Sequence, residues 1–157
     1  MVVAPALASA LALAWLVRAD FSRPAVAASL ALLPLLVALA PSPLELALTV
    51  GIEAPIVFAL AAKLGLNRWR AALVSGLANA LTQPLVHLAL VRLPAAGPAA
   101  WRLDVAALEI GVWLAEAGVY LVCLPDLRRA RRPLIEALAI SLAANAASTA
   151  VGLLLPV

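Results

Sequence analysis

The sequence predicts an all-α integral membrane protein, a bundle of about six transmembrane helices that forms a single membrane domain over residues 1–157. Of the 157 residues, 66% are hydrophobic and 12% are charged, whereas an average soluble domain is roughly 45–50% apolar and 25% charged. Eleven basic and eight acidic residues are too few to cover the surface of a soluble fold of this size. The apolar residues lack the period-two alternation of a membrane β-barrel, so we expect helices.

Six apolar runs lie between the charged residues and define the expected spans. A helix satisfies its backbone N–H and C=O groups internally, and about 17–25 apolar residues cross a hydrocarbon core roughly 30 Å thick. The expected spans are residues 1–17, 24–40, 44–62, 71–91, 105–124 and 133–155. The first two runs are short, so they either cross a thinned bilayer or form one re-entrant pair. Because no basic residue precedes the first run, we expect a retained helix there and not a cleaved secretory signal.

Turn residues support these boundaries. Pro133 suits the first turn of a helix, and Pro94 and Pro125 mark connections. The connection over residues 93–104 is expected to be the longest.

Basic residues are distributed unevenly between the connections. Nine lie in three alternate connections: Arg18, Arg23, Lys63, Arg68, Arg70, Arg128, Arg129, Arg131 and Arg132. Only Arg92 and Arg102 lie elsewhere. The positive-inside rule then places both termini outside, in a cytoplasmic membrane of the bacterial inner-membrane type. Because this orientation explains the positive charge, we expect no nucleic-acid partner; Trp69 and Trp101, at span ends, are expected to be interfacial anchors.

Spans three and four resemble spans five and six in their polar residues, which predicts a parallel repeat of two helix hairpins. The third span has acids at Glu45 and Glu53, and the fifth has acids at Glu109 and Glu116. The fourth and sixth spans share the pattern Ser-x-x-x-Asn-x-x-Thr/Ser, and these steps of three and four residues keep the polar groups on one helix face. The residues of this pattern are Ser75, Asn79 and Thr82, and Ser141, Asn145 and Ser148. Coincidence in a chain of low complexity is the alternative explanation.

Glu53 and Glu116 lie near the middle of their predicted spans, as do Asn79 and Asn145, so we expect all four to meet near the centre of the bilayer. An isolated acid at that depth costs roughly 2.5–3.5 kcal/mol. Every Lys and Arg lies at a span end, so the two acids must be protonated, bound to a cation, or exposed to a water-filled cavity. An Asn amide can donate to a carboxylate and accept from a carboxylic acid, so these neighbours suit both states.

The remaining polar residues extend this site or hold helices together. Glu45 and Glu109 would continue a polar path toward the outer surface, whereas the serines and threonine also suit hydrogen bonds between helices. Gln83 and His87 flank Pro84 and would join an outer vestibule if the helix bends there. Gly111 and Gly118 are interpreted as a small-residue packing stripe, and the single Cys123 as a packing residue.

These residues favour a small carrier coupled to protons or cations over two alternatives. In the carrier, Glu53 and Glu116 hold the ion, Asn79 and Asn145 are neutral partners, and hydroxyls complete the site. The first alternative is an intramembrane hydrolase that uses Glu53, Glu116 and His87, and the second is a noncatalytic subunit or assembly factor of a membrane complex. No obligatory cofactor is expected. The occupant would be a proton, Na⁺ or a hard divalent cation at Glu53 and Glu116, and the partners would be the lipid bilayer and either a second copy or another membrane subunit.

Overall fold

A computed structural model describes residues 42–92 and 97–154, and all of its elements are helices. Their order is α3 (Pro43–Lys63), α4 (Arg68–Arg92), α5 (Pro98–Cys123), α6 (Pro125–Arg128) and α7 (Pro133–Leu154). Four of these helices, α3, α4, α5 and α7, are long and apolar enough to cross a membrane, as an integral membrane protein requires. The expected spans 1–17 and 24–40 lie outside the described residues.

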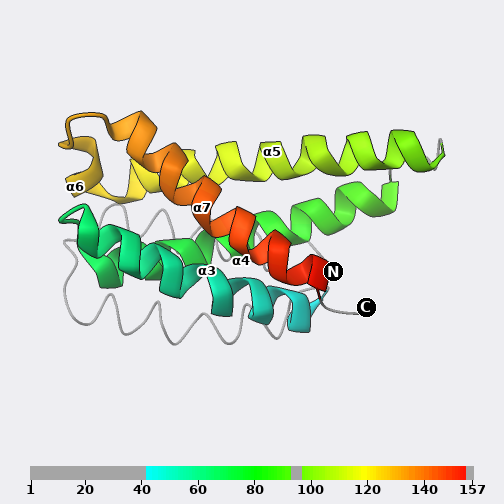
Figure 1. Cartoon of the computed structure of the whole chain (residues 1–157), viewed down its shortest axis with the longest axis horizontal. Coiled ribbons are helices and arrows are strands. Elements are labelled where there is room, and N and C mark those ends of the chain that lie inside the picture. The colour runs from blue at the N-terminus through cyan, green and yellow to red at the C-terminus, as the bar shows by residue number, and fades with distance from the viewer. Residues whose placement is uncertain (1–41, 93–96, 155–157) are drawn as a thin grey trace.

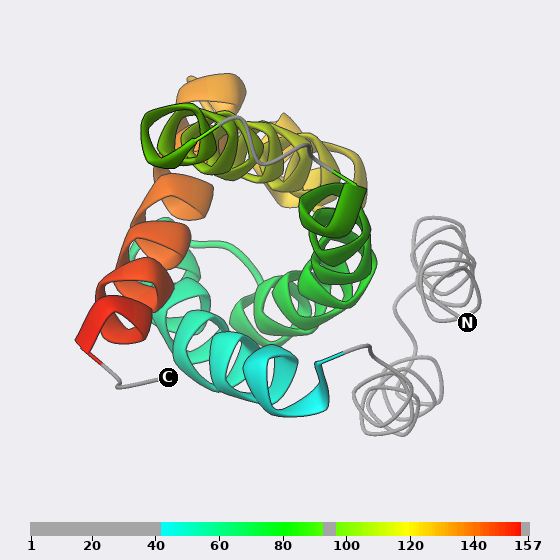
Figure 2. The same cartoon turned by 90° about the vertical axis from the view of Figure 1, so that its right-hand side faces the viewer.

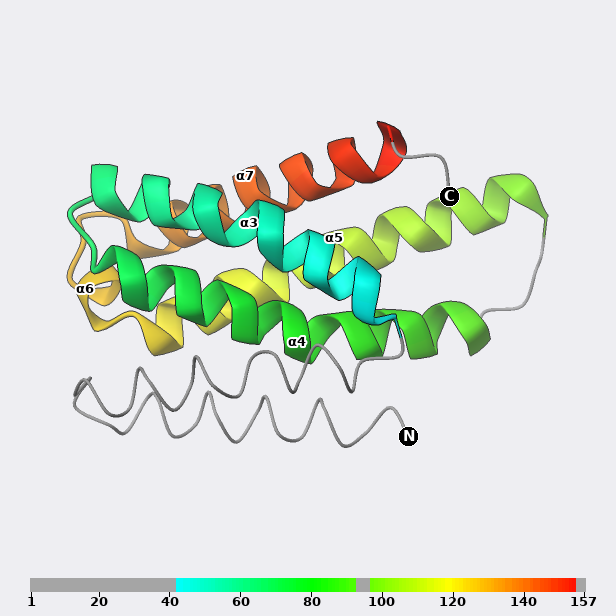
Figure 3. The same ribbon diagram turned by 90° about the horizontal axis from the view of Figure 1, so that it is seen from below.

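The four long helices form a closed ring. Helix α3 contacts α4 and α7, and α5 contacts α4 and α7; within the described residues the diagonal pairs make no contact. Figure 2 shows this ring end-on, and Figures 1 and 3 show the helices running along one axis, with α6 at the end where α3 gives way to α4. The two basic connections of the described chain, after α3 and around α6, therefore lie at the same end of the bundle.

Two hairpins build the ring, and a glycine closes the tight turn of the first. The Gly65 N–H donates to the Ala62 carbonyl oxygen at 3.3 Å and the Leu66 N–H donates to the Ala61 carbonyl oxygen at 2.9 Å. This pair of bonds is a Schellman motif, and it places Gly65 at φ +70°, a region that costs little only for a residue without a Cβ. At the start of α4, the Asn67 side chain accepts a hydrogen bond from the Arg70 N–H at 3.1 Å.

Replacing Gly65 with alanine is expected to lower the free energy of unfolding by about 1–2 kcal/mol, because the Cβ clashes with the backbone at positive φ. The measurement is unfolding of the purified protein in mixed micelles, followed by circular dichroism. Gly118→Ala is the matched control, since its backbone is not at positive φ and a Cβ there meets no described atom within 4 Å. Equal stability of the two variants would contradict the assignment of this turn.

The connection after α4 is shorter than the sequence predicts. Helix α5 begins at Pro98, so Trp101, Arg102 and Asp104 belong to its first turns and the expected 93–104 loop is wrong. Charged side chains are tolerated there because this part of the helix is at the end of the bundle, where polar groups reach the interface. The extension also places Glu116 on the C-terminal side of the middle of α5, seven residues before Cys123. The connection after α5 contains the short helix α6, which the sequence did not predict.

The outer surface of the ring is largely apolar, as contact with lipid requires. Leu44, Leu103 and Leu134 are among its exposed large side chains. Trp69 and Trp101 are both exposed near helix ends, and the Trp69 ring packs edge-on to Phe58 at a centroid distance of 4.8 Å. Both tryptophans are therefore placed as interfacial anchors would be.

Within residues 42–92 and 97–154, the glycines of α5 do not pack closely against a neighbouring helix. A Cβ added at Gly111 or Gly118 would meet no described atom within 4 Å. At these two positions the expected packing stripe is therefore not formed against any described helix.

Candidate functional site

The first half of the site lies inside the α3–α4 hairpin. Glu53 is fully buried on α3 and faces Asn79 on α4. The Asn79 Nδ2 group donates to Glu53 Oε2 at 2.8 Å and to the Ser75 carbonyl oxygen at 3.1 Å. The same amide group therefore donates hydrogen bonds both to the carboxyl group of Glu53 and to a backbone carbonyl in the preceding turn of its own helix.

The second half lies inside the α5–α7 hairpin and repeats this geometry. Glu116 is fully buried on α5. The Asn145 Nδ2 group donates to Glu116 Oε2 at 2.6 Å and to the Ser141 carbonyl oxygen at 3.0 Å. In both hairpins the asparagine bonds to the acid of the partner helix and to the carbonyl four residues earlier.

Each acid also contacts a hydroxyl group from the other hairpin. The Ser148 Oγ atom of α7 lies 2.6 Å from Glu53 Oε1, and the Thr82 Oγ1 atom of α4 lies 3.4 Å from Glu116 Oε1. The two hairpins thus exchange hydroxyl groups reciprocally. We call the set Glu53, Asn79, Thr82, Glu116, Asn145 and Ser148 the Glu–Asn cluster.

The hydroxyls of the cluster have more acceptors than protons. Ser148 Oγ also lies 3.0 Å from the Asn145 carbonyl oxygen, and Thr82 Oγ1 lies 3.1 Å from the carbonyl oxygen four residues before it. A hydroxyl has one proton and two lone pairs, so it donates either to the carbonyl or to the carboxylate. When it donates to the carbonyl, it can accept the proton of a carboxylic acid. The cluster can therefore satisfy Glu53 and Glu116 whether they are ionised or protonated.

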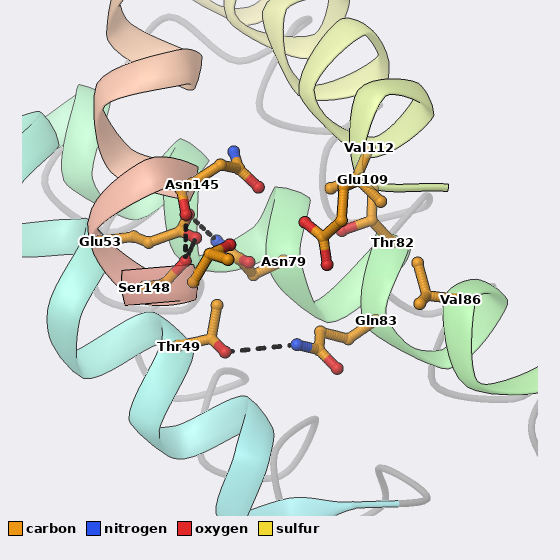
Figure 4. A pocket seen from close by; sticks show the side chains of 11 residues that line it. Thr49, Glu53, Asn79, Thr82, Gln83, Val86, Glu109, Val112, Asn145 and Ser148 are labelled. Carbon is orange, nitrogen blue, oxygen red and sulfur yellow. Dashed lines mark hydrogen bonds between the residues drawn. The ribbon is translucent and has the colours of Figure 1, made fainter. Parts of the chain in front are cut away.

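A polar pocket of about 150 Å³ leads to this cluster. It is lined by Thr49, Glu53, Asn79, Thr82, Gln83, Val86, Glu109, Val112, Asn145, Ser148 and Thr149. Figure 4 shows Glu109 directed into the pocket opposite Glu53, and a hydrogen bond of 3.2 Å from Gln83 to Thr49 that joins α4 to α3. The lining residues lie in the half of the bundle away from α6, so the pocket faces the end with few basic residues.

The two acids of the cluster differ in their access to this pocket. Glu53 lines it, whereas Glu116 does not and accepts a further 3.4 Å hydrogen bond from Ser141. The two carboxyl groups interact electrostatically, so their charges repel when both are ionised. The described hydrogen bonds to both acids come from amides and hydroxyls. Among the described residues no group of three or more His, Cys, Asp or Glu side chains gathers into a metal site.

The other residues singled out from the sequence fall into three places. Glu109 lines the polar pocket, whereas Glu45 is exposed in the first turn of α3 and is not among its lining residues. His87 is half-buried on α4 and, unlike Gln83, does not line the pocket either. Ser75 and Ser141 are buried on the side of the cluster nearer to α6.

Thr149 and Trp113 are among the residues of the site that were missed from the sequence. Thr149 lines the pocket four residues after Asn145, a spacing that could have revealed it, since Gln83 stands four residues after Asn79. Trp113 donates from its indole Nε1 to the Leu138 carbonyl oxygen at 2.8 Å, and its own carbonyl oxygen accepts from Ser141 at 3.0 Å. A tryptophan in an apolar run gives no signal of such a role.

The site is therefore a pair of buried acids in matching surroundings, reached through a polar pocket from one end of a helical bundle. Its interpretation depends on this geometry and on the chemistry of its side chains. No known protein family, curated protein or solved structure matches this chain.

Proposed function

We propose that the protein is a small membrane carrier that couples the movement of a solute to protons or cations at the Glu–Asn cluster. The observation that carries the proposal is the reciprocal exchange, in which the hydroxyl of each hairpin bonds to the acid of the other, Ser148 to Glu53 and Thr82 to Glu116. A change in the charge of either acid changes a bond between the two hairpins, which links ion binding to their relative position.

A structural role alone accounts poorly for these acids. Each buried carboxylate costs several kcal/mol in hydrocarbon, whereas a Ser, Thr or Asn hydrogen bond between helices supplies about 0.6–2 kcal/mol. If the only role of Asn79 and Asn145 were to hold the helices together, an amide side chain at the positions of Glu53 and Glu116 would be sufficient. The presence of glutamates at equivalent positions of the two hairpins therefore favours a function in which the carboxyl groups change their charge.

The proposal includes the parallel repeat of α3–α4 and α5–α7. Both hairpins run through the bundle in the same order, and both place Asn and Ser or Thr on their second long helix at the same spacing. The equivalent hydrogen bonds of the asparagines support a common origin. Alternating access would then be a rocking of one hairpin against the other around the cluster.

The proton is the coupling ion that the hydroxyl geometry favours. A protonated Glu53 donates to Ser148, which donates in turn to the Asn145 carbonyl oxygen; an ionised Glu53 accepts from Ser148. Na⁺ or a hard divalent cation is the alternative occupant, held by carboxylate, amide and hydroxyl oxygens of the same pocket. By the positive-inside rule, the proposal has α6 on the cytoplasmic side of a bacterial-type inner membrane, so that the pocket would open outward.

Purified protein in lipid vesicles that enclose a pH-sensitive dye tests this proposal. Inward gradients of Na⁺, K⁺ and Mg²⁺ are imposed in turn, and the proposal expects at least one of them to move protons faster than in protein-free vesicles. A protein that copurifies with a stoichiometric membrane partner and moves no protons would instead favour a noncatalytic subunit.

A further inference from the structure

An apolar groove lies between α4 and α5, next to the polar pocket. It has a volume of about 350 Å³. Its lining residues are Thr82, Leu85, Val86, Ala89, Ala107, Leu108, Gly111, Val112 and Ala115. Thr82 is the only polar side chain among these residues, and the open space beside Gly111 forms part of the groove.

The groove and the polar pocket adjoin. Thr82, Val86 and Val112 line both of them, so a molecule that displaces these side chains at the junction would reach both spaces. Thr82, which lines both spaces, also contacts Glu116. A molecule at the junction would therefore be separated from Glu116 by the Thr82 side chain alone.

The charge of the polar part selects the sign of its occupant. Glu53 and Glu109 both line the pocket and interact electrostatically with each other, and its other polar lining residues are neutral amides and hydroxyls. A positive group placed between the two carboxylates relieves their repulsion, whereas an anion would increase it.

We propose that the solute of this carrier is a lipophilic organic cation. Its positive group lies in the polar pocket beside Glu53 and Glu109, and its apolar part lies in the α4–α5 groove. This inference rests on the proposed function, since it names the substrate class of the same site. The cation and a proton compete for Glu53, so its binding releases a proton from the carboxyl group to the water of the pocket.

Three small probes separate the charge requirement from the apolar requirement. Decyltrimethylammonium has both features, tetramethylammonium has the charge alone, and decanesulfonate has the same chain with the opposite charge. Binding to wild-type protein in lipid nanodiscs is measured with radiolabelled probes, and binding to protein-free nanodiscs is subtracted. We expect decyltrimethylammonium to bind about tenfold or more tightly than tetramethylammonium, because burial of each methylene adds to affinity. We expect a similar preference over decanesulfonate, because Glu53 and Glu109 repel an anion.

A pair of glycine variants on one helix tests the groove itself. Gly111→Leu fills the groove and is expected to weaken decyltrimethylammonium binding by about tenfold, since the chain loses its buried surface. Gly118→Leu makes the same change on α5 outside the lining of the groove, and binding should stay as in wild type. The wild-type probe series needs no variant, so the inference stays testable if Gly111→Leu does not fold.

The results distinguish this inference from the function on which it rests. Equal binding of decyltrimethylammonium and decanesulfonate would mean that the groove holds a lipid chain without regard to charge, and would overturn the inference. A second result would also overturn the inference: the protein shows no preference for decyltrimethylammonium but carries an inorganic cation in a flux that depends on Glu53. The proposed function as a coupled carrier would still hold in that case. Preferential binding without any proton release would support the binding site and contradict the coupled carrier.

Discussion

Replacing Glu53 and Glu116 together with glutamine is expected to reduce proton-coupled flux to the level of protein-free vesicles. Glutamine keeps the size of the side chain and its hydrogen bonds but does not lose a proton between the two states. The bonds of Ser148 and Thr82 to the two acids then no longer change with pH, so the two hairpins lose their link to the proton. Flux is measured in vesicles with the pH-sensitive dye, as for the wild-type protein.

The single variants and a distant acid provide the controls. Each single variant should abolish coupling if both acids act together, whereas Glu136→Gln, in the first turn of α7, should leave flux unchanged. Infrared difference spectra between acidic and alkaline pH should show a carboxylic acid band in the wild type that the double variant lacks. Undiminished flux in a folded double variant would exclude the two acids as the ion site.

The double variant Glu53→Gln with Asn79→Leu is expected to show strong energetic coupling between these two side chains. Asn79→Leu alone removes the amide donor of a fully buried acid and also leaves the Ser75 carbonyl without it. A buried group that loses its partner costs about 1–3 kcal/mol, so this variant should unfold at a clearly lower denaturant concentration.

In the Glu53→Gln background the same substitution should cost less, because the neutral amide at residue 53 tolerates the loss of its donor better than a carboxylate does. The expected coupling energy is about 0.5–3 kcal/mol, measured by equilibrium unfolding of the wild type, both single variants and the double variant. Additive effects would show that Asn79 stabilises the helix pair without acting on the acid.

Long apolar runs made the four long helices α3, α4, α5 and α7 predictable, because a backbone in hydrocarbon must form its own hydrogen bonds. The start of α5 was not predictable in the same way. The charges of Arg102 and Asp104 predicted a loop, yet a helix continues through charged residues where its end reaches water. The short helix α6 was also missed, since a run of arginines after Pro125 indicates sidedness and not conformation.

Spacing predicted which side chains share a helix face, but not their partners. Ser75 and Ser141 occupy equivalent positions four residues before an asparagine, yet Ser141 bonds to the Trp113 carbonyl and Glu116, whereas the Ser75 hydroxyl has no hydrogen-bond partner among the described residues. The reciprocal contacts of Thr82 and Ser148 depend on how the hairpins meet, which a single helix pattern does not contain.

The Ser75 and Tyr120 hydroxyls lie next to one another without a hydrogen bond of acceptable geometry, fully enclosed on the α6 side of the two acids. Neither residue lines the polar pocket, so the described part of the bundle is hollowed toward the end opposite α6 and filled by these two side chains toward α6. In the proposed carrier, opening toward the α6 end would require Tyr120 to separate from Ser75, and both enclosed hydroxyls would then gain water as partners. Because neither hydroxyl would lose a hydrogen bond in that step, the separation would cost little free energy.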